Sequence, residues 1–243
     1  MSYYIGLSIL SNNGPDSGRG GKERQKRLSD EARRMVSLLA DRPIAADTLA
    51  RDGQGRPFFP GGDVDFSISH SGSLAAVSLV KGAGLRTGCD VELVRPRARA
   101  GGIAENFFSA AERDYIFRRG LPPDEPDEGR RFFRIWTLKE CYLKLRGMSV
   151  FDMAAVPSFI DNGDFACNAA GSAPLTFSLY ELCGMGERYI LATAVEGAEA
   201  EQPEIRWFSP AGGADEAALA SLPCKNIVCQ SGGLAAPVET TIP

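Results

Sequence analysis

Histidine is almost absent from this 243-residue chain, which contains His70 and no other. A single histidine excludes zinc centres that need several imidazole ligands. The six cysteines include no Cys-X-X-Cys pair, which argues against a zinc finger and against a small disulfide-held scaffold. We therefore expect free and mostly buried thiols.

Long apolar runs and an excess of positive charge are missing as well. No stretch approaches the roughly 20 apolar residues of a membrane span, and the first ten residues have no cationic lead-in. The net charge of −4 argues against nucleic-acid binding as the main activity, since a phosphate backbone favours a strongly basic surface. We expect a cytoplasmic protein with neither a membrane nor a nucleic-acid partner.

Hydrophobic periodicity and turn residues indicate a mixed α+β chain. Residues 19–34 are locally basic, which indicates either an edge that attracts a polyanion or an ordinary solvated helix face. Ser29 is expected to cap an amphipathic helix that ends before Pro43, and Ser109 and Glu112 have the spacing of a capping box. The longest predicted helix is 130–146, and strands are predicted at 3–10, 66–70, 75–80, 89–94, 175–182, 189–195 and 204–208. The strands within 66–94 are expected to form one small, largely antiparallel sheet.

Two carboxylates alternate along the predicted strand 89–94. Asp90 and Glu92 point to the same side of that strand, with their backbones roughly 6.6 Å apart. Their side chains can converge on one hard divalent cation, which prefers oxygen ligands. The alternative is a solvent-facing acidic strand, because Asp-X-Glu is a common tripeptide.

A stripe of three functional side chains runs along the helix predicted at 130–146. Trp136, Glu140 and Lys144 recur at one-turn spacing, and Lys139 adds a second ammonium group. One carboxylate with two cations suits a magnesium pyrophosphate site. An ordinary Glu140–Lys144 ion pair with Trp136 in the core is the alternative.

A third group of polar residues surrounds His70, at the end of a predicted strand. Ser69 and Ser71 flank it, and this position suits hydrogen bonding to a phosphate, although a lone histidine is more often structural. Arg56 lies in a tight Gly-containing turn upstream, from which it can reach an anion.

Taken in order, these elements resemble the motifs of the 4'-phosphopantetheinyl transferases of the surfactin-synthetase type. The family pattern is Gly-(Lys/Arg)-Pro, Ser-His-Ser, Gly-X-Asp-X-Glu and Trp-(Ser/Thr)-X-Lys-Glu-X-X-X-Lys. The matching residues are Gly55-Arg56-Pro57, Ser69-His70-Ser71, Gly88-Cys89-Asp90-Val91-Glu92 and Trp136-Thr137-Leu138-Lys139-Glu140-Cys141-Tyr142-Leu143-Lys144, together with Phe107-Phe108-Ser109 and Glu112. Each motif is modest alone, whereas the ordered set is specific.

The resemblance implies a fold of two similar α+β halves related by a pseudo-twofold axis, with coenzyme A in the cleft between them. We expect the halves at residues 1–104 and 105–222, and a loose tail at 223–243. A monomer is expected, with a magnesium ion, or manganese in its place, held by Asp90, Glu92 and Glu140. The nucleotide and phosphate pocket would be lined by Arg34, Arg56, Ser69, His70, Lys139 and Lys144.

The implied reaction moves 4'-phosphopantetheine from coenzyme A to a serine of an apo acyl or peptidyl carrier protein and releases 3',5'-ADP. Glu140, directly or through a metal-bound water, is the candidate general base, and Lys144 would neutralise the pyrophosphate. Two alternatives stay open: a non-catalytic module that binds coenzyme A or a carrier protein, and a magnesium-dependent hydrolase of nucleotide pyrophosphates. The sequence does not identify the carrier protein or its pathway.

Overall fold

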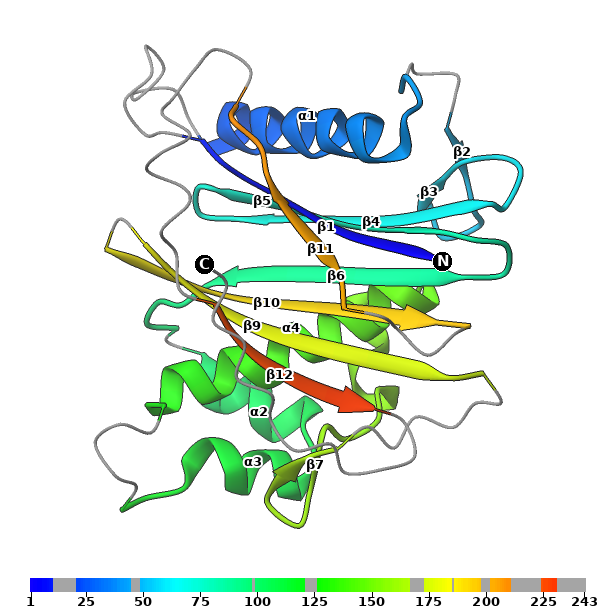
Figure 1. Ribbon diagram of the computed structural model, residues 1–243. Helices are drawn as coiled ribbons and strands as arrows, with labels where there is room; N and C mark the ends of the chain where they lie inside the picture. The colour runs from blue at the N-terminus through cyan, green and yellow to red at the C-terminus, as the bar shows by residue number, and fades with distance from the viewer. Residues whose placement is uncertain are drawn as a thin grey trace.

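Two four-stranded sheets and their covering helices form most of the described part of the chain. The computed structural model describes residues 1–10, 21–44, 49–97, 99–120, 126–166, 173–184, 186–197, 202–210 and 224–230. Helix α1 (Gly21–Ala40) covers one sheet, and α4 (Glu128–Arg146) covers the other (Figure 1). The predicted mixed α+β class is confirmed. Among the described residues, no helix has the length and apolar character to cross a membrane.

Both sheets are antiparallel except for one parallel pair, β1 with β11. The first sheet has the order β11-β1-β5-β4 and consists of β1 (Ser2–Ile9), β4 (Val64–Ser71), β5 (Leu74–Lys81) and β11 (Glu204–Trp207). The second has the order β12-β9-β10-β6 and consists of β6 (Arg86–Leu93), β9 (Leu175–Gly184), β10 (Glu187–Glu196) and β12 (Cys224–Gln230). The remaining elements are the short pairs β2 (Ala50–Arg51) with β3 (Pro57–Phe58) and β7 (Ile160–Asp161) with β8 (Asp164–Phe165), helices α2 (Ala100–Phe107) and α3 (Ala110–Phe117), and the 3-10 helix η1 (Val150–Ala155).

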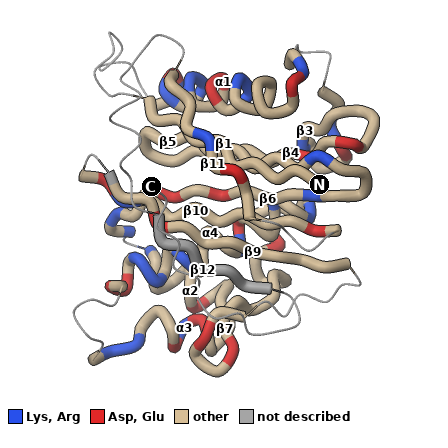
Figure 2. The backbone as a smooth tube through the Cα atoms, viewed as in Figure 1, with Lys and Arg blue, Asp and Glu red and all other residues tan. Residues whose placement is uncertain are grey.

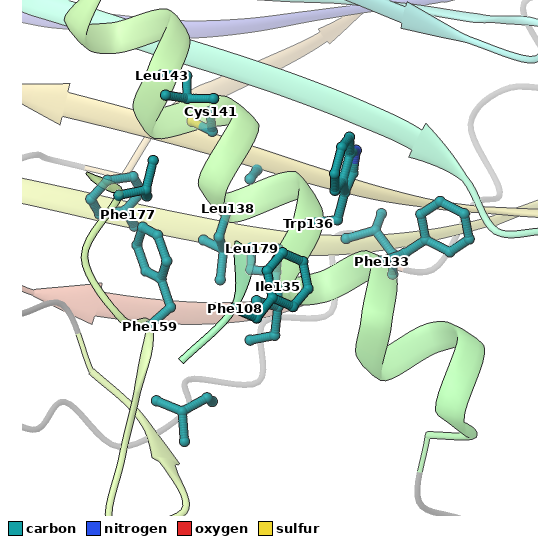
Figure 3. Close-up of a cluster of buried hydrophobic side chains, with 14 of the residues drawn as sticks. Phe108, Phe133, Ile135, Trp136, Leu138, Cys141, Leu143, Phe159, Phe177 and Leu179 are labelled. Carbon is teal, nitrogen blue, oxygen red and sulfur yellow. The ribbon is translucent and has the colours of Figure 1, made fainter. Parts of the chain in front are cut away.

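Three apolar clusters separate the layers. One lies between α1 and the first sheet, with Met35 and Val77 at its centre. A second lies between the two sheets and includes Ile5 and Leu191. The largest lies between the second sheet and the helices below it, where Phe177 of β9 packs against Phe159 (Figure 3). Successive side chains of a strand point to opposite faces of its sheet, so one strand contributes to the clusters on both faces.

Three predictions about the elements are corrected by the structure. Strand β6 pairs with β10 in the second sheet, not with β4 and β5, although it lies within the segment 66–94. Helix α1 begins at Gly21, so Ser29 lies inside it, because the lysine-, arginine- and glutamate-rich residues before Ser29 are good helix formers. Residues 224–230 of the predicted loose tail form β12, where pairing with β9 satisfies the backbone of a short segment. The capping box at Ser109 is confirmed.

Strands β4 and β6 lie side by side where the edges of the two sheets meet, and side chains of β4 bond the backbone of β6. Three side chains of β4 accept hydrogen bonds from backbone N–H groups of β6: Asp65 from Thr87 at 2.8 Å, Ser69 from Val91 at 3.2 Å and Ser71 from Leu93 at 3.1 Å. The sequence offset is the same in each pair, so the two strands run in the same direction. This side-chain ladder connects the sheets beside the acidic residues of β6.

Candidate active site

Strand β6 presents Asp90 and Glu92 to α4, as the alternation predicts. Its other side chains, such as Cys89 and Val91, are buried between the sheets. Gly88 permits the close approach of β6 to α4, since a Cβ atom there would lie 2.5 Å from the carbonyl oxygen of Cys141. The glycine of the Gly-X-Asp-X-Glu motif therefore has a packing role.

Helix α4 supplies the opposite wall of the site. Asp127 caps its first turn, and Gly147 ends it in the left-handed conformation with φ 66°. Trp136 and Lys144 both reach β6 from the same side of this helix, and Glu140 lies between them in the sequence. The predicted stripe is therefore formed.

Lys144 connects α4 to both edge strands. Its Nζ atom lies 2.7 Å from Asp90 Oδ1 and donates a hydrogen bond of 2.9 Å to Ser69 Oγ. Ser69 donates in turn to Asp90 Oδ1 at 2.9 Å. The side chain of Lys144 is 32% exposed, so it is less enclosed than that of Asp90, which is 7% exposed.

Glu92 is held by donors on either side. Ser71 Oγ donates to Glu92 Oε2 at 2.9 Å, and Trp136 Nε1 donates to Glu92 Oε1 at 3.2 Å. Burial, together with the charge of Asp90, raises the pKa of Glu92 in spite of these donors. A further cation nearby would therefore stabilise the ionised form of Glu92.

Electrostatic coupling links the three carboxylates and Lys144. Burial, followed by the charges of Asp90 and Glu92, raises the pKa of Glu140 to about 7, with Lys144 opposing. Burial opposes the charge on Lys144, but Asp90 outweighs that effect and raises the pKa of the lysine. Glu140 is thus a carboxyl group that can take up or release a proton near neutral pH.

The arrangement suits a divalent cation, although the ligand atoms are not gathered around a common point. Over the described ranges, no three histidine, cysteine or acidic side chains have the geometry of a formed metal site. Asp90 Oδ2, however, is buried without a hydrogen-bond partner. A buried carboxylate oxygen that lacks a donor costs free energy, and a cation between Asp90, Glu92 and Glu140 would remove that cost.

Arg56 and Lys144 line the same cavity, which has a volume of about 260 Å³. The guanidinium of Arg56 is anchored by Asp65 at 2.7 Å and by the carbonyl oxygen of Thr87 at 2.9 Å. The cavity lies between the turn that carries Arg56 and the end of α4 at Gly147 and Met148. Both side chains are charged donors of the kind that bind phosphate, and each is also paired with a carboxylate, Arg56 with Asp65 and Lys144 with Asp90.

His70 is close to the site but serves as a hydrogen-bond partner in this structure. Its Nε2 atom lies 3.1 Å from Ser29 Oγ on α1. Burial, reinforced by the charge of Lys144, lowers the pKa of His70. The lowered pKa favours the neutral imidazole.

Lys139 does not reach the cavity, contrary to the sequence-based expectation. Its ammonium group lies on the far side of α4, 3.1 Å from Glu112 Oε2, and its side chain is 1% exposed. Adjacent residues of a helix differ in direction by about 100°, so Lys139 and Glu140 face different layers. The Lys-Glu motif thus combines one structural and one site residue.

Arg34 also lies elsewhere. It pairs with Glu31 at 2.7 Å and donates to the carbonyl oxygen of Ser209, next to β11. Strand β11 forms the edge of the first sheet opposite β4, so Arg34 is remote from the cavity of Arg56.

The structure instead brings two unpredicted arginines to a neighbouring cavity of about 470 Å³. Arg33 and Arg51 line this cavity. Three of its other lining residues, Pro57, Phe66 and Ile68, also line the first cavity. Figure 2 shows basic residues along α1, the helix that carries Arg33. The basic composition of 19–34 indicated the segment but not which arginine faces inward.

Comparison with known proteins gives a consistent picture. Residues 86–194 match the 4'-phosphopantetheinyl transferase superfamily, and this range includes Asp90, Glu92, Glu140 and Lys144. The chain is 39% identical over 132 residues to the 4'-phosphopantetheinyl transferase AcpT of Escherichia coli (strain K12), a match that covers 51% of this chain and 65% of AcpT.

More distant matches have the same description. The 4'-phosphopantetheinyl transferase HetI of Nostoc sp. is 34% identical over 108 residues, which cover 44% of this chain and 38% of HetI. The 4'-phosphopantetheinyl transferase psf-1 of Bacillus pumilus is 31% identical over 144 residues, which cover 54% of this chain and 57% of psf-1. The chain spans 65% of the length of AcpT and less of these two relatives.

Proposed function

We propose that this chain, with its superfamily region at residues 86–194, transfers 4'-phosphopantetheine from coenzyme A to a serine of an apo acyl or peptidyl carrier protein. The observation that carries the proposal is the contact of Lys144 with Asp90 beside the cavity that Arg56 also lines. Phosphate-binding cations and acidic metal ligands thus lie together, as phosphoryl-type transfer requires. The second product is 3',5'-ADP.

Asp90, Glu92 and Glu140 are the residues that would hold a divalent cation, which is magnesium in this proposal. Such an ion, when bound, stabilises negative charge on the pyrophosphate oxygens. The buried, unpartnered Oδ2 atom of Asp90 supports this role. Carboxylate oxygens are also the ligands that magnesium prefers over nitrogen or sulfur.

Glu140 would accept the proton of the carrier-protein serine. The serine oxygen forms a bond to the phosphorus that bears pantetheine, and the bond from that phosphorus to the oxygen of 3',5'-ADP breaks. Without a cation, burial and the neighbouring carboxylates raise the pKa of Glu140 to about 7, and a cation held beside it would favour the ionised form that accepts a proton. Lys144 neutralises charge on the leaving phosphate, while Arg56 and His70 contribute to the nucleotide and phosphate pocket.

The proposal extends to the organisation of the protein. We place it in the surfactin-synthetase-type subfamily, as a cytoplasmic monomer with halves at 1–104 and 105–222. Strands β1, β4 and β5 of the first sheet come from residues 1–104, and β9 and β10 of the second come from 105–222, which supports this division, while β11 joins the first sheet from the second half. Strand β6 then belongs to the first half in sequence and to the second sheet in space, so the Asp90–Lys144 contact depends on the packing of both halves.

The direct test is incubation of the purified protein with coenzyme A, magnesium and a panel of apo carrier proteins, followed by intact-mass measurement of each carrier. We expect one carrier to gain the mass of a phosphopantetheine, and EDTA to abolish the gain. Free phosphopantetheine without modified carrier would indicate hydrolysis instead. Tight coenzyme A binding without either product would indicate a binding module.

Glu140→Gln tests the assigned base in the same assay. We expect transfer to fall by at least about 100-fold, because general-base catalysis contributes roughly that much or more. Glu128→Gln is the matched control, since Glu128 is an exposed glutamate in the first turn of the same helix. An undiminished rate in the Glu140→Gln variant would remove Glu140 from the mechanism.

A further inference from the structure

The Glu92 carboxylate differs from its two acidic neighbours in having a neutral donor on each oxygen. Ser71 Oγ donates to Oε2 at 2.9 Å from β4, and Trp136 Nε1 donates to Oε1 at 3.2 Å from α4. The two donors come from elements on different sides of β6, so together they restrict both the position and the rotation of the carboxylate. Each oxygen retains a lone pair for a cation.

The hydroxyl of Ser71 is itself fixed in direction. Its oxygen accepts a hydrogen bond of 3.1 Å from the backbone N–H of Leu93, so its single proton is directed to Glu92. Ser71 thus forms one step of the β4–β6 ladder and one contact to the acidic site. A shift of β4 along β6 would break both.

The indole of Trp136 is equally constrained. Its ring stacks on Phe132 with a centroid distance of 6.1 Å and an interplanar angle of 15°. The guanidinium of Arg97 lies 4.5 Å from the ring centroid. Only 8% of Trp136 is exposed, so the ring cannot turn its N–H away from Glu92 without repacking these neighbours.

We propose that Ser71 and Trp136 are positioning residues that hold Glu92 in the orientation needed to bind a divalent cation with Asp90 and Glu140. This inference rests on the proposed function, because it takes the three carboxylates as the cation ligands. It assigns a reason for the tryptophan of the Trp-Thr-X-Lys-Glu sequence and for the second serine of Ser-His-Ser. Groups that orient metal ligands commonly change metal affinity 10- to 100-fold when they are removed.

Binding of Mn²⁺ to the full-length protein, without coenzyme A or carrier, tests the inference. Free Mn²⁺ is measured by electron paramagnetic resonance during titration, and chemical unfolding confirms that each variant is folded. We expect Ser71→Ala and Trp136→Phe each to weaken Mn²⁺ binding by about tenfold. Ser71→Thr, which retains the hydroxyl, should bind Mn²⁺ nearly as tightly as the wild type.

Two matched controls separate positioning from general packing. Ser78→Ala removes another buried hydroxyl that contacts β6, through Thr87, which is distant along the strand from Glu92. Trp207→Phe alters the second of the chain's two tryptophans. Both variants should retain wild-type Mn²⁺ affinity, and a tenfold loss in either would overturn a specific role for Ser71 and Trp136.

The outcomes distinguish this inference from the proposed function. Unchanged Mn²⁺ affinity in both Ser71→Ala and Trp136→Phe overturns the inference even if the wild type transfers phosphopantetheine. Tenfold weaker binding in these variants supports it even if no carrier is modified, in which case only the transferase proposal fails. A wild type that binds no Mn²⁺ overturns the inference as well.

Discussion

Helix α4 carries two lysines, each beside a carboxylate, and the surroundings of these pairs differ. Lys139 and Glu112 are 1% and 0% exposed, and their polar atoms are satisfied within the protein. Glu112 also accepts hydrogen bonds from the backbone N–H groups of Ser109 and Phe159, at 2.8 and 2.9 Å. Lys144, in contrast, lines a cavity, and its partner Asp90 has one oxygen without a hydrogen-bond partner.

The electrostatics follow the same division. Burial lowers the pKa of Lys139, and Glu112 only partly offsets that effect. Asp90 overcomes burial and raises the pKa of Lys144, while Asp90 and Glu92 also help raise the pKa of Glu140. The comparison teaches that a buried ion pair alone does not identify a functional site. An excess of carboxylates with an unsatisfied oxygen is the more informative feature.

The largest effect is expected where the enclosed pair is broken. Glu112→Gln leaves the ammonium group of Lys139 buried without a counter-charge, and we expect a loss of about 3–5 kcal/mol in the free energy of unfolding. Urea unfolding monitored by circular dichroism measures this change. A loss below about 1 kcal/mol would mean that water or a rearranged partner reaches Lys139, and the contrast with Lys144 would disappear.

A second substitution checks the cause of that loss. Adding Lys139→Met to Glu112→Gln removes the unpaired charge, so part of the lost stability should return. No recovery would assign the loss to the hydrogen bonds from Ser109 and Phe159 instead.

An intermediate effect is expected at another enclosed carboxylate, Glu181 on β9. Burial alone would raise its pKa, but Arg130 at 2.7 Å, with Arg134 and Arg188, lowers it to about 2. A carboxyl group with a lower pKa in the folded than in the unfolded state stabilises the fold where it is ionised. This contribution, about 2–3 kcal/mol, is therefore present above the unfolded pKa of about 4.3 and is lost as the pH falls towards 2.

Unfolding measured at a series of acidic pH values tests the role of Glu181. The wild type should lose stability more steeply than Glu181→Gln between about pH 4 and pH 2. Parallel curves would show that the arginine cluster does not hold the carboxylate in its ionised form. Glu181 does not line the cavity beside Lys144, so the result also measures how much enclosure of an ion pair contributes to stability away from that cavity.

Sequence patterns predicted those features that depend on near neighbours along the chain. The capping box of Ser109 and the shared face of Asp90 and Glu92 are set by spacing within one element. The direction in which Lys139 points depends on α3, which supplies Glu112, and no local pattern contains that contact. The sheet to which β6 belongs depends likewise on β10, far along the chain.

Which basic residues border the cavities was the least predictable part of the candidate site. Arg33 and Arg34 are adjacent and chemically identical, yet Arg33 faces the larger cavity and Arg34 pairs with Glu31. The rotation of α1 on its sheet decides between them, through packing of residues such as Met35 and Leu39. Composition identifies the basic segment, whereas the face that α1 packs against its sheet determines which arginine lines the cavity.

The smallest change in stability, and the sharpest test of the comparison, is expected for Asp90→Asn. This is the same acid-to-amide substitution as Glu112→Gln, but it also relieves the repulsion that Asp90 exerts on Glu92 and Glu140. Without divalent cations, we expect the free energy of unfolding to change by less than about 1 kcal/mol, because the lost pair with the partly exposed Lys144 is offset by that relief. Magnesium should raise the unfolding temperature of the wild type and of Glu112→Gln but not that of Asp90→Asn, since a bound ligand stabilises the folded state in proportion to its occupancy. A large loss without metal, or an unchanged magnesium response in Asp90→Asn, would show that Asp90 is a structural residue like Glu112.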